Sequence, residues 1–253
     1  MKTAIITGAS SGLGEQFALQ VHEFFPDIEC VWLVARRRDR LTELARKMRG
    51  VKRVLVLPLD LCDEKSFDAL SSRLEREGTD VGLLVNNAGC GVLGNVGEVA
   101  TQSQTHMTDL NVRALTAVTN IVLPYMSAGA HIINVSSIAS FCANARMTVY
   151  SSTKAYVTSF TYGLAEEQRE RGIGVTAVCP GPMDTEFISR AGITGNSKMF
   201  EQLPYCDPEQ VVAGTYAAAK AGKTVYTPTA FFKFYRILAK VLPESLVARI
   251  AKT

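Results

Sequence analysis

The chain has 253 residues, of which 47% are hydrophobic and 20% are charged, and its formal net charge is +3. This length suits a single open α/β sheet with a large buried core, and the composition excludes global disorder. A net charge this small gives no reason to expect a nucleic-acid partner.

The start of the chain and its cysteines indicate the compartment. The first residues, MKTAIITGAS, lack the layout of a signal peptide, and no stretch of about 18 to 20 apolar residues is free of charge. The six cysteines are irregularly spaced and include no C-x-x-C pair: Cys30, Cys62, Cys90, Cys142, Cys179 and Cys206. This spacing favours reduced thiols over a zinc site or a disulfide framework. We therefore expect a cytoplasmic protein without a metal site.

Short apolar runs alternate with helical patterns along the chain. Continuous apolar runs are typical of strands that are buried on both faces, and seven occur, at residues 4–6, 30–34, 54–57, 81–85, 131–135, 175–178 and 224–226. Helices are predicted over 39–48, 64–77, 102–126 and 150–171, and another begins at Asp207-Pro208, an N-cap followed by proline. This order predicts an α/β fold with one doubly wound, Rossmann-type parallel sheet and helices on both faces. Ligands should then bind at the carboxyl ends of the strands.

One domain over residues 1–253 is expected, because no repeat, low-complexity segment or linker interrupts the pattern. Two segments stand out within it. Residues 182–206 form a long irregular stretch, which in a compact domain is typical of a functional loop, here a substrate loop. Residues 230–252 form an amphipathic helical extension.

The first turn reads TGASSGLG at residues 7–14, directly after a predicted strand and before a helix. Glycine allows a tight turn and lets the backbone approach a pyrophosphate, while the free N–H groups of the following helix attract phosphates. We favour this interpretation over a purely structural turn. The turn residues expected at the cofactor are Gly8, Ser10, Ser11, Gly12, Leu13 and Gly14.

The second strand ends in VWLVARRRDRL, without a carboxylate. Enzymes that use NAD usually place Asp or Glu at this point to hold the ribose 2′-hydroxyl. Here Ala35 is followed by Arg36, Arg37 and Arg38, and a guanidinium can bind a 2′-phosphate through two hydrogen bonds. The alternative is a solvated basic helix start, which is electrostatically unfavourable. We predict that NADP(H) is preferred over NAD(H), with Arg36 as the first phosphate ligand and Arg37 as the second.

Several further motifs follow the glycine-rich turn in a fixed order. They are Asp60-Leu61, NNAG at residues 86–89, Asn111, Ser137, Tyr150, Lys154, Pro180-Gly181 and Thr185. In this order they resemble the classical short-chain dehydrogenase/reductase (SDR) family over about residues 1–228. The resemblance implies an oxidoreductase in which Asp60, Leu61, Asn87, Ala88 and Gly89 border the adenosine half of the cofactor. It also implies that Pro180, Gly181 and Thr185 hold the nicotinamide end.

Tyr150 and Lys154 are four residues apart, so they share one face of a predicted helix. A tyrosine with an ordinary pKa of about 10 is a slow acid or base at neutral pH, and a nearby ammonium should lower that pKa. Lys154 could also reach the ribose hydroxyls of the cofactor. Ser137 ends the strand HIINVS, where its hydroxyl can stabilise a developing alkoxide. Asn111 resembles the family asparagine that holds a water near the lysine and completes a proton relay.

The expected substrate wall is mostly apolar and comprises residues 90–93, 141–147, Met183, Phe187 and 199–203. Arg146 and Arg190 are the candidates for binding an anionic substrate group. Otherwise an apolar pocket suits a hydrophobic ketone or aldehyde, lipid-like or steroid-like, without choosing among them. His22, His106 and His131 lack the spacing of metal ligands and are interpreted as structural or surface residues.

The tail carries Phe231, Phe234, Tyr235, Leu238, Val241 and Leu242 on one helical face and Lys233, Arg236 and Lys240 on another. Such a helix can lie on an anionic membrane surface. It can also dock on its own fold or on a partner subunit and cover the substrate loop, which we favour.

Two functions from different classes fit this sequence. The first is an NADP(H)-preferring oxidoreductase that acts on CH-OH donors and interconverts a carbonyl compound and an alcohol. The second is a non-catalytic NADP(H)-binding sensor or regulator, which would be expected to lack the tyrosine or the lysine. Because both are present, we favour the enzyme, and family analogy predicts a homodimer or homotetramer formed through the long central helices.

Overall fold

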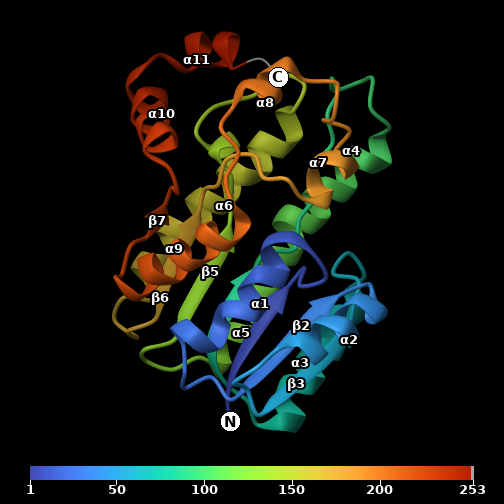
Figure 1. The fold of residues 1–253 in the computed structure, drawn as a ribbon, viewed down its shortest axis with the longest axis vertical. Helices are drawn as coiled ribbons and strands as arrows, with labels where there is room; N and C mark the ends of the chain where they lie inside the picture. The colour runs from blue at the N-terminus through green and yellow to red at the C-terminus, as the bar shows by residue number, and fades with distance from the viewer. Residues whose placement is uncertain (252–253) are drawn as a thin grey trace.

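A seven-stranded parallel sheet forms the centre of the molecule (Figure 1). The computed structural model describes residues 1–251, apart from the side chains of Lys198, Met199 and Ile250. The strands follow the order β3-β2-β1-β4-β5-β6-β7, with β1 at Lys2–Thr7, β2 at Cys30–Ala35, β3 at Arg53–Pro58, β4 at Asp80–Asn86, β5 at His131–Val135, β6 at Gly174–Val178 and β7 at Val225–Tyr226. The chain runs outward in opposite directions from β1 and β4, so their carboxyl ends meet at the switch point where such sheets bind ligands.

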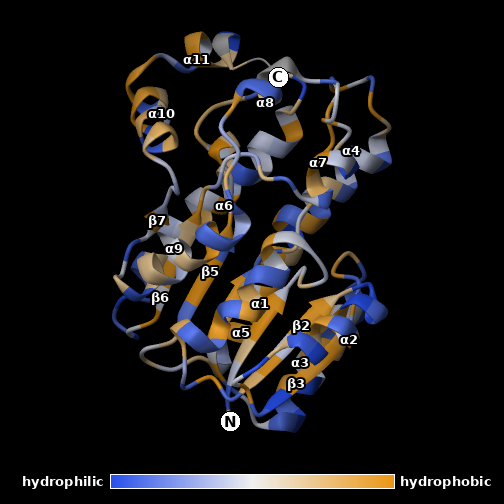
Figure 2. Ribbon diagram, viewed as in Figure 1, coloured by the Kyte–Doolittle hydropathy of each residue, from blue (hydrophilic) through white to orange (hydrophobic). Residues whose placement is uncertain are grey.

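Helices cover both faces of the sheet. One face carries α1 (Gly12–Phe24), α2 (Arg38–Lys47) and α9 (Pro208–Lys220), and the other carries α3 (Glu64–Glu77), α5 (Leu115–Val122) and α6 (Thr148–Glu167). Successive side chains of a strand point to opposite faces: Val31 and Leu33 pack in one core, and Trp32 and Val34 in the other. This double burial explains the continuous apolar runs, visible as orange strands in Figure 2. The predicted Rossmann-type fold is confirmed.

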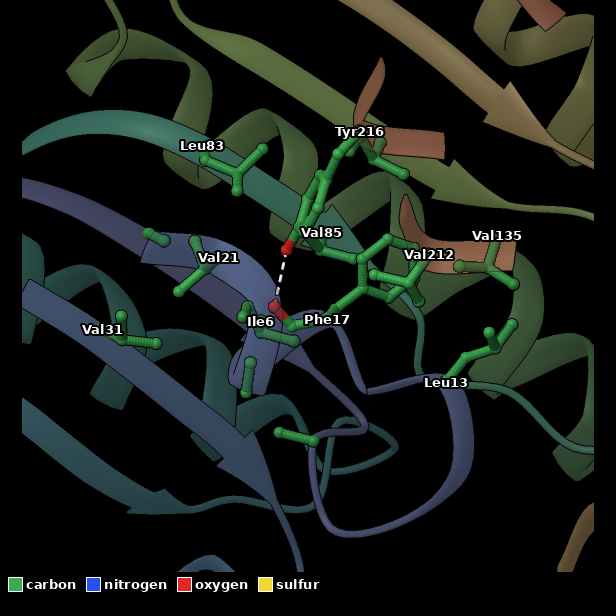
Figure 3. Close-up of a cluster of buried hydrophobic side chains, with 14 of the residues drawn as sticks. Ile6, Leu13, Phe17, Val21, Val31, Leu83, Val85, Val135, Val212 and Tyr216 are labelled. Carbon is green, nitrogen blue, oxygen red and sulfur yellow. Dashed lines mark hydrogen bonds between the residues drawn. The ribbon is translucent and has the colours of Figure 1, made fainter. Parts of the chain in front are cut away.

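The first core joins the two ends of the chain. Phe17 of α1 and Tyr216 of α9 are fully buried, and their rings meet edge to face with centroids 5.3 Å apart. The Tyr216 hydroxyl donates a hydrogen bond of 2.6 Å to the Phe17 carbonyl oxygen (Figure 3). Burial without that bond would leave a polar group unsatisfied. The contact therefore fixes α1, and with it the glycine-rich turn, against α9.

The long helix expected over residues 102–126 is interrupted in the structure. It consists of α4 (Thr101–Thr108), a π-helical turn over Asp109–Ala114, α5 and a 3-10 turn over Leu123–Tyr125. Asn111 lies in the π-helical turn and is 1% exposed. Such turns within a helix frequently occur at functional sites. The sequence pattern predicted the helical region but not the break, because the hydrogen-bond partner of Asn111 lies far away in the chain.

Two other predicted helices have different bounds. α2 begins at Arg38 and ends at Lys47, since Met48 is extended. α6 runs over Thr148–Glu167 in place of 150–171, and residues after Glu167 form turns that lead to Gly172, which has a φ of +67°. Glycine adopts this left-handed conformation at little cost, and it ends the helical region before β6.

Short helices occupy the segment after β6 and the end of the chain. The predicted loop contains α7 (Glu186–Arg190) and α8 (Lys198–Gln202), and the tail forms α10 (Ala230–Val241) and α11 (Glu244–Ile250). In Figure 1, α10 and α11 (red) lie beyond the carboxyl ends of the strands, on the side of β6 and β7. No helix within residues 1–251 is long and apolar enough to cross a bilayer.

Candidate active site

A cavity of about 980 Å³ opens at the carboxyl edge of the sheet. It extends from the end of β2, at Arg36, to the C-terminal helices, at Phe232. Of the expected cofactor residues, it is lined by Gly8, Ser10, Ser11, Gly12, Leu13, Arg36, Arg37, Asp60, Leu61, Asn87, Ala88, Gly89, Tyr150, Lys154, Pro180, Gly181 and Thr185. Ser137 also lines it, whereas Gly14 and Asn111 do not. Residues that are distant in the sequence therefore share one wall.

The glycine-rich turn passes too close to β4 for larger residues. Gly8 has a φ of +64° and Gly12 a φ of +59°, in the left-handed region that favours glycine. A Cβ atom on Gly8 would lie 2.7 Å from the side-chain amide nitrogen of Asn87, and one on Gly14 would lie 2.2 Å from the Gly8 carbonyl oxygen. Gly14 thus permits close packing behind the turn and does not line the cavity.

The start of α1 retains free hydrogen-bond donors. Its N-cap is Ser11, whose side chain makes no capping hydrogen bond. The first N–H groups of a helix have no partner within the helix, and together with the helix dipole they attract anions. A narrow turn, a cavity above it and an uncapped helix start fit a dinucleotide pyrophosphate.

Asn87 and Thr7 hold the ends of β1 and β4 together. The Asn87 amide donates to the carbonyl oxygens of Thr7 and Gly8 at 3.0 and 3.1 Å. The Thr7 hydroxyl accepts from the backbone N–H groups of Asn87 and Ala88 at 3.0 and 3.1 Å. These bonds place residues 87–89 along the cavity, so the structural interpretation of the NNAG motif holds in addition to any role at a cofactor.

The arginines after β2 differ in their surroundings. Arg36 is exposed at the edge of the cavity. Arg37 donates to the hydroxyls of Ser10 and Ser11 at 3.0 and 2.9 Å, and it forms a 2.9 Å ion pair with Glu186 of α7. A guanidinium thus sits directly above the turn that should hold the cofactor.

Glu186 is a site residue that the sequence reasoning missed. Besides Arg37, its carboxylate contacts Arg40 at 3.2 Å and Arg190 at 2.8 Å. The hydrogen bond from Arg37 and the surrounding positive charges lower the pKa of Glu186. The signal for these pairs is not local, because Glu186 lies 149 positions after Arg37 in the chain.

Tyr150, Lys154 and Ser137 converge where β5 meets α6. Tyr150 is 7% exposed and Lys154 is 5% exposed, and the lysine Nζ lies 5.8 Å from the centroid of the tyrosine ring. Lys154 donates a 2.8 Å hydrogen bond to the carbonyl oxygen of Val135. The Ser137 hydroxyl oxygen accepts from the backbone N–H of Ala139 at 3.1 Å, which leaves its proton free to donate. All three catalytic side chains expected here face the same cavity.

Burial dominates the titration of the pair, and one sequence expectation is wrong. The pKa of Tyr150 is raised to about 12 by burial, against a smaller lowering by its hydrogen bond with Ser137. The pKa of Lys154 is lowered to about 8, again by burial. We expected the lysine to lower the tyrosine pKa, but removing water from a phenol disfavours its anion more strongly. The phenol is therefore protonated at neutral pH.

The Asn111 side chain connects two parts of the fold by hydrogen bonds and does not line the cavity. Its amide oxygen accepts from the Cys90 N–H at 2.9 Å, and its amide nitrogen donates to the Cys90 carbonyl oxygen at 2.9 Å. The nitrogen also donates to the Thr153 hydroxyl at 3.0 Å. The side chain thus ties the segment after β4 to α6 beside Lys154.

The substrate end of the cavity is mostly apolar. From the expected wall, Cys90, Gly91, Val92, Asn144, Met147, Met183, Phe187, Phe200 and Leu203 line it. Leu93, Phe141, Cys142, Ala143, Ala145 and Arg146 are not among the lining residues, and the Met199 side chain lies outside the described residues. His106, interpreted from the sequence as a structural or surface residue, lines the cavity. Arg190 also lines it, but it is paired with Glu186.

The C-terminal helices complete this wall. The cavity is bordered by Phe231, Phe232, Tyr235, Leu238, Ala239, Leu242, Val247 and Ala251. Phe232 is fully buried against Gly181, where a Cβ atom would lie 2.2 Å from its ring. The tail therefore docks on the fold at the Pro180-Gly181 turn. Among the described residues, no three His, Cys, Asp or Glu side chains cluster as metal ligands.

Comparison with known proteins points to one group. The sequence model of the family described as short chain dehydrogenase matches residues 2–194. Sulfoacetaldehyde reductase 2 from Chromohalobacter salexigens is 37% identical over 188 residues, covering 72% of this chain and 73% of that protein. A short-chain dehydrogenase from Sphingobium yanoikuyae, solved in complex with NADPH, has a TM-score of 0.79 and 29% identity, and the match covers 97% of both chains.

Two more solved structures have the same fold. The bulky-bulky ketone specific alcohol dehydrogenase from Comamonas testosteroni has a TM-score of 0.74 and 28% identity, with coverage of 97% of this chain and 96% of that one. A short chain dehydrogenase/reductase from Burkholderia phymatum, solved in complex with NAD, has a TM-score of 0.81 at 23% identity, with coverage of 94% and 92%. The likeness to the latter concerns the fold alone.

Proposed function

Because this chain belongs to the short-chain dehydrogenase/reductase family, we propose that it is an NADP(H)-dependent oxidoreductase acting on a hydrophobic carbonyl compound and its alcohol. The observation that carries the proposal is the convergence of Tyr150, Lys154 and Ser137 on one cavity. The other end of that cavity is formed by the glycine-rich turn and Arg37.

The three side chains have distinct parts in carbonyl reduction. When bound, the reduced nicotinamide supplies the hydride to the carbonyl carbon. The Tyr150 hydroxyl donates its proton to the carbonyl oxygen, and in alcohol oxidation the phenolate takes that proton back. The Tyr150 phenol is protonated at neutral pH, and the positive charge of Lys154 beside it favours release of that proton. The Ser137 hydroxyl, which hydrogen-bonds Tyr150 in the cofactor-free protein, can turn to the same oxygen and stabilise the charge that develops there.

Lys154 and Asn111 position the reacting groups. One proton of the Lys154 ammonium is bound to the Val135 carbonyl oxygen, and the other two are available to ribose hydroxyls and to Tyr150. Asn111 holds Thr153 and the backbone of Cys90 and so fixes the helix that carries Tyr150 and Lys154. We class it as a positioning residue.

The preference for NADP(H) rests on charge. Arg36 and Arg37 border the cavity, and no carboxylate is present at the end of β2 to hold a ribose 2′-hydroxyl. A 2′-phosphate would gain charge-assisted hydrogen bonds there. The related Sphingobium enzyme was solved with NADPH, which agrees with this assignment.

The substrate class follows from the cavity wall. Apolar side chains from the segment after β4, from α7 and from α10 surround the space beside Tyr150. Arg190 would be the group to bind a carboxylate or sulfonate, and it shares the Glu186 carboxylate with Arg37 and Arg40. A bulky, uncharged ketone, aldehyde or alcohol, lipid-like or steroid-like, fits this wall best. A non-catalytic sensor would have no use for the buried tyrosine–lysine–serine arrangement.

The test is a panel of ketones, aldehydes and their alcohols followed by nicotinamide absorbance, with each cofactor in turn. We expect turnover with large apolar carbonyl compounds, a higher kcat/KM with NADPH than with NADH, and a smaller ratio of the two in Arg36→Ala. Turnover of small sulfonated aldehydes in preference to apolar ketones would contradict the substrate class. An unchanged cofactor ratio in Arg36→Ala would contradict the phosphate site.

A further inference from the structure

The helix α10 has an inner face that belongs to the fold. Phe232 and Ala239 are buried, and Phe232 packs against Gly181. Tyr235 and Leu242 lie on the same side and line the cavity.

The outer face of α10 is apolar and exposed. Phe234, Ile237 and Val241 are 65%, 62% and 76% exposed, and their spacing of three and four residues aligns them along one side of the helix. We call these three residues the outer strip. An aligned apolar strip on an amphipathic helix, bordered by basic residues, is the arrangement of helices that lie on a membrane surface.

Positive charge borders the outer strip. Lys233 and Lys240 are exposed, and neither forms an ion pair with a described residue. Residues 230–253 contain five basic residues and one acidic residue, so their net charge is +4. The remaining 229 residues contain 22 basic and 23 acidic side chains, a net charge of −1. The positive charge of this chain is therefore concentrated in the segment that exposes the strip.

A second copy of the chain is a poor occupant for this surface. A two-fold dimer through the strip would bring Lys233 and Lys240 close to the same lysines of the partner, and like charges at an interface are unfavourable. A 12-residue helix is about 18 Å long and about 10 Å wide, so the strip offers roughly 200 Å², against the roughly 800 Å² that each partner of a stable interface buries.

We propose that α10 lies on an anionic lipid surface, with the outer strip inserted at the boundary between headgroups and acyl chains. Lys233 and Lys240 would then face the lipid phosphates. The helix would lie parallel to the membrane surface. Its inner face would remain the wall of the cavity, which places the membrane next to a pocket suited to apolar molecules. Binding to lipid does not depend on the oxidoreductase activity.

The experiment is co-sedimentation of the cofactor-free protein with vesicles, without any substrate. One set contains phosphatidylglycerol and phosphatidylcholine, and the other contains phosphatidylcholine alone. We expect sedimentation with the anionic vesicles at low salt and its loss at high salt. Lys233→Gln/Lys240→Gln should reduce the partition coefficient roughly 30-fold, since two cations leave the surface. Phe234→Ser/Ile237→Ser should reduce it at least about tenfold.

A matched control comes from elsewhere on the surface. Val96 is 62% exposed and does not line the cavity, so Val96→Ser should sediment like the unmodified protein. Neither Phe234 nor Ile237 lines the cavity, so their double variant should retain its unfolding transition and its turnover of a soluble substrate. Failure of the unmodified protein to sediment with anionic vesicles would overturn the proposal, as would unchanged sedimentation of Phe234→Ser/Ile237→Ser. A dimer in solution that the same double substitution abolishes would assign the strip to a second copy instead.

Discussion

Replacement of Lys154 by methionine tests how strongly burial acts on this lysine. The side chain is 5% exposed, and its ammonium donates to the Val135 carbonyl oxygen. No carboxylate among the described residues forms an ion pair with it. Burial lowers the pKa of Lys154 from 10.5 to about 8. The folded state therefore holds this proton less tightly than the unfolded state does.

The pKa shift has a calculable effect on stability. At pH 7 the lysine is charged in both states, and its burial costs about 3 kcal/mol of unfolding free energy for a shift of this size. Above about pH 8 the folded lysine loses its proton while the unfolded one retains it up to about pH 10.5. The unfolded state then binds more protons, so this penalty fades as pH rises. Methionine has a similar length and no charge, and it loses only the hydrogen bond to Val135, worth about 1 kcal/mol at every pH.

The measurement is urea unfolding of the cofactor-free protein and of Lys154→Met between pH 7 and 10. We expect the variant to be more stable by about 2 kcal/mol at pH 7 and no more stable than the unmodified protein by pH 10. The difference in unfolding free energy between the two proteins removes the contribution of the buried cysteines, whose pKa values burial also raises, because both proteins carry them. Lys65→Met provides the control, because it removes the same charge from an exposed side chain. A difference for Lys154→Met that stays constant across this range would refute the reasoning.

Two further substitutions test contacts around the cavity. Gly181→Ala should lower the unfolding free energy by about 1 to 3 kcal/mol because its Cβ meets the Phe232 ring. Phe232→Ala should then lower the unfolding free energy less in the Gly181→Ala variant than in the unmodified protein. Strictly additive shifts of the denaturant midpoint would contradict the contact. Glu186→Gln removes the anion that pairs with Arg37 and should tighten NADP binding relative to NAD roughly threefold, measured by titration calorimetry; an equal change for both cofactors would contradict competition between Glu186 and the 2′-phosphate.

The sheet could be predicted closely because its signal is local. The inner strands are buried on both faces, and the apolar runs mark all seven strands to within a few residues. The glycine-rich turn was also predictable, because a tight turn from a strand into a helix needs positive φ values that glycine adopts most readily. Gly8 and Gly12 have φ values of +64° and +59°. The same holds for the positions of Ser137, Tyr150 and Lys154 at the carboxyl edge of the sheet.

The parts that could not be predicted depend on contacts between distant residues. Asn111 sits in a π-helical turn and bonds the backbone of Cys90, 21 residues earlier. Glu186 reaches Arg37 across 149 positions. The direction of the Tyr150 pKa shift depends on burial, which the spacing of Tyr150 and Lys154 does not reveal. Helical periodicity marked the tail as amphipathic but did not identify Phe232 as its anchor.

The central claim is that Tyr150 transfers the proton in a reaction that depends on NADP(H). It is tested most directly by comparing the unmodified protein with Tyr150→Phe for NADPH affinity and for single-turnover oxidation of NADPH by an accepted ketone. Phenylalanine keeps the ring that contacts Phe187 at 5.5 Å and removes only the hydroxyl. We expect unchanged NADPH affinity and a rate at least about a hundredfold lower, as for loss of a general acid. Oxidation of NADPH at the unmodified rate by Tyr150→Phe would contradict the account.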